Sequence, residues 1–110
     1  MVWNVPTKLE SAVQRAVVEY ARSKGATAIK IAVQGGMGVA GYPDYIFLKV
    51  RDSHKGFGIL FIEFKKPGGR KPEKHQEDRI KLLRSKGFMV EVVAHADYGK
   101  MEIDIWLLSL

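Results

Sequence analysis

Apolar residues recur along this chain in two spacings, one typical of helices and one typical of strands. Leu9, Val13 and Ala16 repeat at helical spacing, and Gly25 is a typical helix stop. The patterns predict helices over residues 7–24, 73–86 and, from a more ambiguous amphipathic tail, 97–110. They predict strands over residues 26–33, 44–50, 57–65 and 88–94.

The order of these elements, αβββαβα, predicts an α/β fold. A sheet flanked by helices is the expected arrangement for such an order. The strands over 44–50 and 57–65 are separated by a short polar turn, which favours an antiparallel hairpin. We therefore expect one domain over residues 1–110, with no repeat and no second domain.

The strand over 57–65 carries two charges at its end. Alternate side chains of a strand share a face, so Glu63 and Lys65 point the same way as Ile59 and Phe61. The strand is apolar on both faces, and such a strand has little reason to bury charge without a function. The structural alternative is an ion pair between the two charged residues at the strand end.

Asp44 opens the first strand of the predicted hairpin, and Glu63 lies near the end of the second. In an antiparallel pair the start of one strand lies beside the end of the other. Two carboxylates held close repel each other unless a cation lies between them, and Mg²⁺ prefers such oxygen ligands. The pattern predicts a metal site at Asp44 and Glu63, with the adjacent Phe64 backbone carbonyl as a further ligand. The alternative for Asp44 is a capping role in a turn.

This predicted cluster suits hydrolysis of a phosphodiester. A bound divalent ion polarises a phosphate oxygen and lowers the pKa of a bound water. Lys65, on the same face as Glu63, could position that water or stabilise charge that develops on the phosphate.

Two further polar residues are candidates for the same site. Glu10 borders the apolar stripe of the first helix, but it also stands three residues after Thr7, where a capping box would use it. Gln76 precedes Ile80 by one helical turn, so it is expected along the apolar face, towards the sheet. A buried amide needs hydrogen-bond partners, which the carboxylate site would supply. The alternative for Gln76 is an ordinary residue of the first helical turn.

Positive charge is concentrated in one segment of the chain. The formal net charge is +6, and residues 65–86 hold nine Lys or Arg against three acidic residues, while the rest of the chain is balanced. A local basic patch suits nucleic acid, although a solvated basic helix is the alternative. The expected DNA-binding residues are Lys66, Arg70, Lys71, Lys74 and His75.

Several classes of protein are disfavoured. The chain has no cysteine, which excludes disulfides and thiolate-bound zinc. No apolar run approaches the roughly 20 residues of a membrane span, and no signal peptide is recognisable, so we expect an intracellular protein. The glycine-rich stretch 34–43 lacks the Gly-Lys-Ser/Thr ending of a P-loop and leads into a strand, which argues against a nucleotide cofactor.

The motifs in this order resemble the PD-(D/E)xK nuclease signature and, more narrowly, the VRR-NUC family of virus-type replication-repair nucleases. That family shows a glutamate in an N-terminal helix, a Gly-x-Pro-Asp element, Glu-x-Lys and a helical glutamine shortly afterwards. The matching residues here are Glu10, Gly41-Tyr42-Pro43-Asp44, Glu63-Phe64-Lys65 and Gln76. The resemblance implies a restriction-endonuclease-like αβββαβ core with a mixed sheet, and it covers residues 7 to about 94.

The resemblance also implies a function. It implies a DNA endonuclease dependent on Mg²⁺ or Mn²⁺, in which Asp44 and Glu63 bind metal, Glu10 assists, Lys65 activates water and Gln76 orients the site. Small members of that family act as homodimers on branched DNA such as four-way (Holliday) junctions, and a viral origin in a bacterial host is implied likewise. The open alternatives are a nucleic-acid-binding module without catalysis, a nuclease for flaps or linear duplex, and a sequence-specific restriction-type enzyme.

Overall fold

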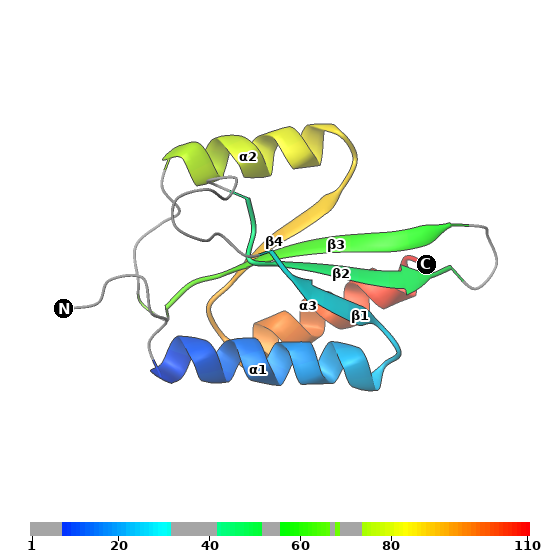
Figure 1. Cartoon of the computed structure of the whole chain (residues 1–110), viewed down its shortest axis with the longest axis horizontal. Coiled ribbons are helices and arrows are strands. Elements are labelled where there is room, and N and C mark those ends of the chain that lie inside the picture. The colour runs from blue at the N-terminus through cyan, green and yellow to red at the C-terminus, as the bar shows by residue number, and fades with distance from the viewer. Residues whose placement is uncertain (1–7, 32–41, 52–55, 67, 69–73) are drawn as a thin grey trace.

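The computed structural model describes residues 8–31, 42–51, 56–66, 68 and 74–110. The predicted element order is confirmed within these residues (Figure 1). The helices and strands are α1 (Lys8–Ser23), β1 (Thr27–Lys30), β2 (Tyr45–Val50), β3 (Phe57–Phe64), α2 (Lys74–Ser85), β4 (Met89–Val93) and α3 (Ala96–Leu108). The tail of the chain, ambiguous in sequence, is therefore a helix.

The strands form a mixed sheet in the order β1-β2-β3-β4. β1, β2 and β3 are antiparallel neighbours, whereas β4 runs parallel to β3. The predicted hairpin is confirmed, with Tyr45 opposite Ile62 at one end of the ladder and Val50 opposite Phe57 at the other. A parallel pair needs a crossover connection, and α2 lies in the segment that links β3 to β4.

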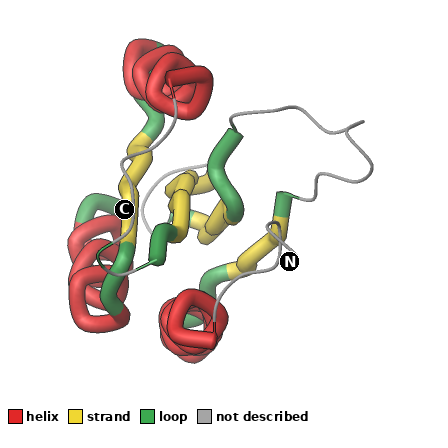
Figure 2. Tube along the Cα trace, turned by 90° about the vertical axis from the view of Figure 1, so that its left-hand side faces the viewer, coloured by secondary structure: helices red, strands yellow, loops and turns green. Residues whose placement is uncertain are grey.

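Helices cover both faces of the sheet. Figure 1 shows α2 on one side and α1 with α3 on the other, and Figure 2 shows the strands lying between the helices. The larger apolar core lies towards α1 and α3 and the smaller one towards α2. Leu60 and Ile62 belong to the larger core, and Phe61 belongs to the smaller. The alternation predicted for β3 is thus confirmed, and it places the side chain of Glu63 on the α2 face.

The helix α3 packs closely on α1 and β4. Trp106 is buried in the larger core, and Trp3 lies outside the described residues. Gly99 permits the close approach: a Cβ built there would stand 2.5 Å from Val17 Cγ2 and 3.0 Å from Val93 Cγ1. No helix among the described residues is long and apolar enough to cross a membrane.

Candidate active site

Asp44 lies directly before β2 and is held by two hydrogen bonds. Its backbone carbonyl accepts a hydrogen bond of 2.8 Å from the backbone N–H of Ile31, the residue after β1. Its carboxylate Oδ2 accepts a bond of 2.8 Å from the backbone N–H of Phe64. Since the hairpin ladder pairs Tyr45 with Ile62, one further step of the same register brings Asp44 level with Glu63. The hairpin therefore brings Asp44 to the end of β3, as the sequence predicts.

Glu63, Lys65 and Gln76 form a closed triangle of polar contacts. Gln76 Nε2 donates to Glu63 Oε2 at 2.7 Å, and Lys65 Nζ donates to Gln76 Oε1 at 3.0 Å. The third side is the ion pair of 3.2 Å between Lys65 Nζ and Glu63 Oε2. Gln76 lies in the first turn of α2 and points towards the sheet, as its position on the apolar face predicts. Lys65 and Glu63 also share one face, as predicted.

Lys65 is additionally fixed through its backbone. Its N–H donates to the carbonyl of Val93 at 2.8 Å, which continues the β3–β4 ladder beyond the last residue of β3. The ammonium group is thus held from a rigid strand extension on one side and from α2 on the other. A group held in this way loses little conformational entropy when a substrate binds.

The carboxyl group of Glu63 lies in an unfavourable environment for a negative charge. The residue is 3% exposed. Burial, together with the neighbouring Asp44 charge, raises the pKa of Glu63 to about 7, although the Lys65 ammonium opposes both effects. Its second oxygen, Oε1, is buried and has no hydrogen-bond partner within the described part of the chain. A buried carboxylate oxygen without a partner is costly, and an additional positive group would relieve that cost.

Phe64 lies between the two charged residues of β3, and its backbone contributes to the site. The N–H and C=O of one strand residue point to the same neighbouring strand. Because the Phe64 N–H points to Asp44, its carbonyl faces the same side. The role of that carbonyl as a metal ligand stays a prediction.

These oxygens fit a hard divalent cation. The two carboxylates of Asp44 and Glu63, with the Phe64 carbonyl beside them, are the kind of ligand that Mg²⁺ and Mn²⁺ prefer. Oε1 of Glu63 is buried and has no hydrogen-bond partner within the described residues, so its lone pairs are available to coordinate such an ion. The described residues contain no group of three or more Asp, Glu, His or Cys side chains placed to hold a metal, so the carboxylate pair is the candidate site there.

Comparisons with known proteins bear on this arrangement. A solved structure described as a VRR_NUC domain is 26% identical to this chain, covers 89% of it and 97% of its own length, and superposes with a TM-score of 0.73. This match supports assignment of the chain to the VRR-NUC family. A second structure, described as a VRR_NUC domain protein, is 24% identical, with 94% and 92% of the two chains covered and a TM-score of 0.68, and shares the fold. No family model and no curated protein matches the chain.

The chain has a restriction-endonuclease-like α/β fold, and its similarity to VRR_NUC domains supports a nuclease-family domain. Its Pro43-Asp44 and Glu63-Phe64-Lys65 elements converge on one point of the sheet, and Gln76 joins them from α2. Glu10 lies in the first turn of α1, but its side chain is outside what the structure describes. Its role as a metal residue stays a prediction.

The structure describes only some of the predicted DNA-binding residues. Lys66, directly after Lys65, is exposed. Lys74 and His75, in the first turn of α2, are exposed as well, and Lys74 forms a surface ion pair of 3.6 Å with Asp78. Arg70 and Lys71 lie outside the described residues. The described basic residues therefore flank the carboxylate site at the end of β3 and the start of α2.

Two residues beside the site were not among the predicted ones. The Arg79 guanidinium lies over the ring of Tyr42, with 5.1 Å from its Cζ to the ring centroid. Tyr42 belongs to the Gly-x-Pro-Asp element, and Arg79 follows Gln76 by three residues, on the same face of α2. That spacing is a signal for Arg79 in the sequence. The pairing with Tyr42 joins distant segments and needs the fold.

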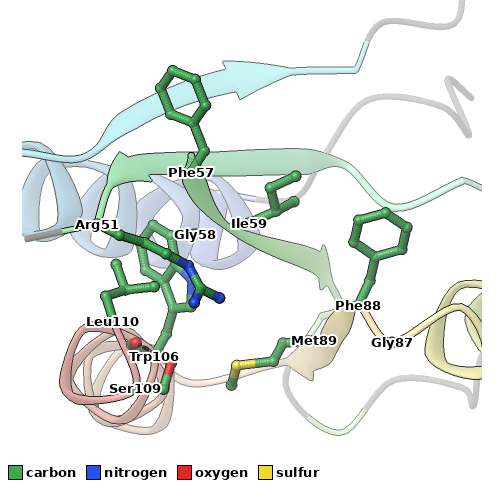
Figure 3. Close-up of a pocket in the computed structure, with 10 residues that line it drawn as sticks. All are labelled: Arg51, Phe57, Gly58, Ile59, Gly87, Phe88, Met89, Trp106, Ser109 and Leu110. Atoms are coloured by element: carbon green, nitrogen blue, oxygen red, sulfur yellow. Dashed lines mark hydrogen bonds between the residues drawn. The ribbon is translucent and has the colours of Figure 1, made fainter. Parts of the chain in front are cut away.

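A pocket of about 200 Å³ lies elsewhere, near the start of β3 (Figure 3). It is lined by Arg51, Phe57, Gly58, Ile59, Gly87, Phe88, Met89, Trp106, Ser109 and Leu110. Neither Asp44 nor Glu63 lines it, so it is separate from the candidate active site.

Proposed function

We propose that this VRR-NUC domain is a metal-dependent endonuclease that hydrolyses phosphodiester bonds of DNA and prefers branched substrates such as four-way junctions. The observation that carries the proposal is the polar triangle of Glu63, Lys65 and Gln76 next to Asp44, with one buried Glu63 oxygen left without a partner. A carboxylate pair with an adjacent lysine suits metal-assisted phosphodiester hydrolysis.

Asp44, Glu63 and the Phe64 carbonyl would hold Mg²⁺ or Mn²⁺, with Glu10 assisting directly or through a water. When bound, such an ion polarises a phosphate oxygen and lowers the pKa of a coordinated water. Lys65 orients the attacking water and stabilises negative charge that develops on the phosphate. Gln76 accepts from Lys65 and donates to Glu63, so it fixes both groups in one geometry.

The exposed basic residues would hold the DNA backbone. Lys66, Lys74 and His75 lie at the edge of the site, and Arg70 and Lys71 belong to the same segment of the sequence. Contacts to phosphate position a protein on DNA but do not read its sequence. Selection by the shape of a branched substrate follows from this. A homodimer, whose two sites are related by a two-fold axis, would suit paired cuts on a symmetric junction. We place such an enzyme inside a cell, in a viral or mobile-element context.

The test is a cleavage assay on a labelled four-way junction with Mg²⁺, Mn²⁺ or EDTA. We expect metal-dependent cutting by the wild type and a loss of about 100-fold or more in Glu63→Gln, since the variant removes one charge from the site. Binding to the junction, measured in EDTA, should remain. The matched control is Glu19→Gln, an exposed glutamate of α1, which should cut like the wild type.

The outcome of this assay distinguishes the proposed nuclease from the alternative functions. Binding without cutting under either metal would contradict the nuclease proposal and favour a binding module without catalysis. Faster cutting of a flap or of linear duplex than of the junction would retain the nuclease and reject the branched-junction preference.

A further inference from the structure

Arg79 has an unusual set of neighbours for a cation at the edge of a site. Its side chain is half-buried and its guanidinium lies over the Tyr42 ring, with 5.1 Å from Cζ to the ring centroid. Among the described residues, no carboxylate lies within ion-pair distance of it. A stacked guanidinium keeps the N–H donors along its edge available, because the ring covers only its face.

Arg79 is tied to the candidate active site from two directions. Its stacking partner Tyr42 precedes Asp44 by two residues. On α2, Arg79 follows Gln76 by three residues, and Gln76 donates to Glu63 at 2.7 Å. The guanidinium is therefore linked to the Asp44 segment through Tyr42 and to the Gln76 segment through α2, and among the described residues it forms no ion pair.

Stacking on Tyr42 suits a particular kind of ligand. An arginine over an aromatic ring is attracted to the face of the ring, which restricts its orientation. Its planar fork of donors matches the oxygens of a phosphate, and a pre-oriented fork loses little entropy on binding. An amine would offer a point charge without that geometry. The chemistry of the group thus points to a phosphodiester of the DNA backbone.

We propose that Arg79 binds a DNA phosphate adjoining the scissile one, and that Tyr42 is the positioning residue that holds it there. This inference rests on the proposed nuclease function and deepens it, because it assigns a further backbone contact to the same site. The basic residues predicted to bind DNA lie in the segment 65–86, and Arg79 adds a contact from the half-buried face of α2.

The test measures binding without cutting. A labelled four-way junction is titrated in EDTA over a series of salt concentrations with the wild type, Arg79→Ala, Arg79→Lys, Tyr42→Phe and Tyr42→Leu. The control is Lys81→Ala, which removes an exposed charge from the same helix. Thermal unfolding of every variant is recorded alongside.

We expect Arg79→Ala to weaken binding about tenfold and to lower the salt slope of binding by about one. Arg79→Lys should recover the slope but only part of the affinity, because it keeps the charge and loses the fork. Tyr42→Phe keeps the ring and should bind like the wild type. Tyr42→Leu should weaken binding although the charge of the protein is unchanged. Lys81→Ala should change neither quantity by a comparable amount.

Equal binding by Arg79→Ala and Lys81→Ala would overturn the inference. So would a loss of thermal stability in Tyr42→Leu and Arg79→Ala with no loss of binding, since the contact would then only attach the Tyr42 segment to α2. If the wild type cuts normally in Mg²⁺ but Arg79→Ala binds normally, the inference about Arg79 is wrong and the proposed nuclease function stands. If binding depends on Arg79 but the wild type never cuts, the proposed nuclease function is wrong and the role of Arg79 in binding stands. Failure of the wild type to bind DNA rejects both.

Discussion

Glu63 is the residue whose environment departs furthest from what folding alone would favour. It is buried at 3% exposure, lies beside the carboxylate of Asp44, and keeps one oxygen without a partner within the described residues. Lys65 and Gln76 compensate only at the other oxygen. Carboxylates perturbed by burial and by a like charge are found preferentially at functional sites. The arrangement is therefore better explained by a ligand than by stability.

This environment makes stability depend on pH. The pKa of Glu63 is raised from 4.5 to about 7 by burial, so the folded state binds its proton more tightly than the unfolded state. The favourable contribution is complete below about pH 4.5 and is lost as the pH rises through about 7. In EDTA, the free energy of unfolding of Glu63→Gln relative to the wild type should therefore rise by roughly 2–4 kcal/mol between pH 4.5 and pH 8.

Urea unfolding at a series of pH values measures this difference directly. Subtraction of the wild-type curve removes the pH dependence that all other groups contribute. Glu19→Gln, at an exposed position, should follow the wild type throughout. A constant offset between Glu63→Gln and the wild type over the whole range would contradict the raised pKa.

At the scale of elements, the packing of α3 on α1 and β4 depends on a missing side chain. A Cβ at Gly99 would stand 2.5 Å from Val17 Cγ2 and 3.0 Å from Val93 Cγ1, distances at which something must shift. Both valines are buried, so neither can turn into solvent. The glycine thus sets how closely the helix approaches the sheet that carries the active site.

We expect Gly99→Ala to destabilise the fold, because overpacking costs about 1–3 kcal/mol and the gain in helix propensity returns only about 1 kcal/mol. Val17→Ala alone should cost about 1–3 kcal/mol, since it removes two buried methyl groups at about 0.5–1.5 kcal/mol each. The double variant should cost clearly less than the sum of the two, because the smaller side chain makes room for the added methyl. Urea midpoints of the four proteins test this, and strict additivity would show that the two positions do not compete for space.

At the scale of the whole molecule, the excess positive charge and the candidate active site lie on the same side of the sheet. The excess of +6 falls in residues 65–86, which include the end of the active-site triangle and all of α2. The helices α1 and α3 lie on the other side (Figure 1). A polyanion is therefore drawn to the side of the sheet that carries Asp44 and Glu63.

Removing two charges beside the site should change how binding responds to salt. Lys66→Ala with Lys74→Ala should weaken binding to a four-way junction in EDTA and lower the salt slope by about two, since each phosphate contact contributes about 0.9. The control removes the same charge from α1 and the turn after it, with Arg15→Ala and Lys24→Ala, and should leave the slope almost unchanged. Equal slopes for the two double variants would mean that net charge, and not this face, governs binding.

The sequence predicts the local features of this protein well, because they depend on neighbours along the chain. Helical spacing defines α1 and α2, and glycines with positive φ follow both, Gly25 at 90° and Gly87 at 92°. Strict alternation in β3 assigns Glu63 and Lys65 to the face opposite Ile62. The hairpin then brings Asp44 to Glu63 by register alone. The Pro43-Asp44 and Glu63-Phe64-Lys65 motifs are likewise recognised from residues adjacent in the sequence.

Only the tertiary structure decides what these residues experience. The packing of α2 on the sheet brings Gln76 into contact with both Glu63 and Lys65, and the burial that raises the Glu63 pKa arises from tertiary packing. The stacking of Arg79 on Tyr42 joins segments that no periodicity relates. Sequence periodicity determines which face a side chain occupies, whereas distances between elements, and therefore desolvation and charge coupling, arise only when the layers pack.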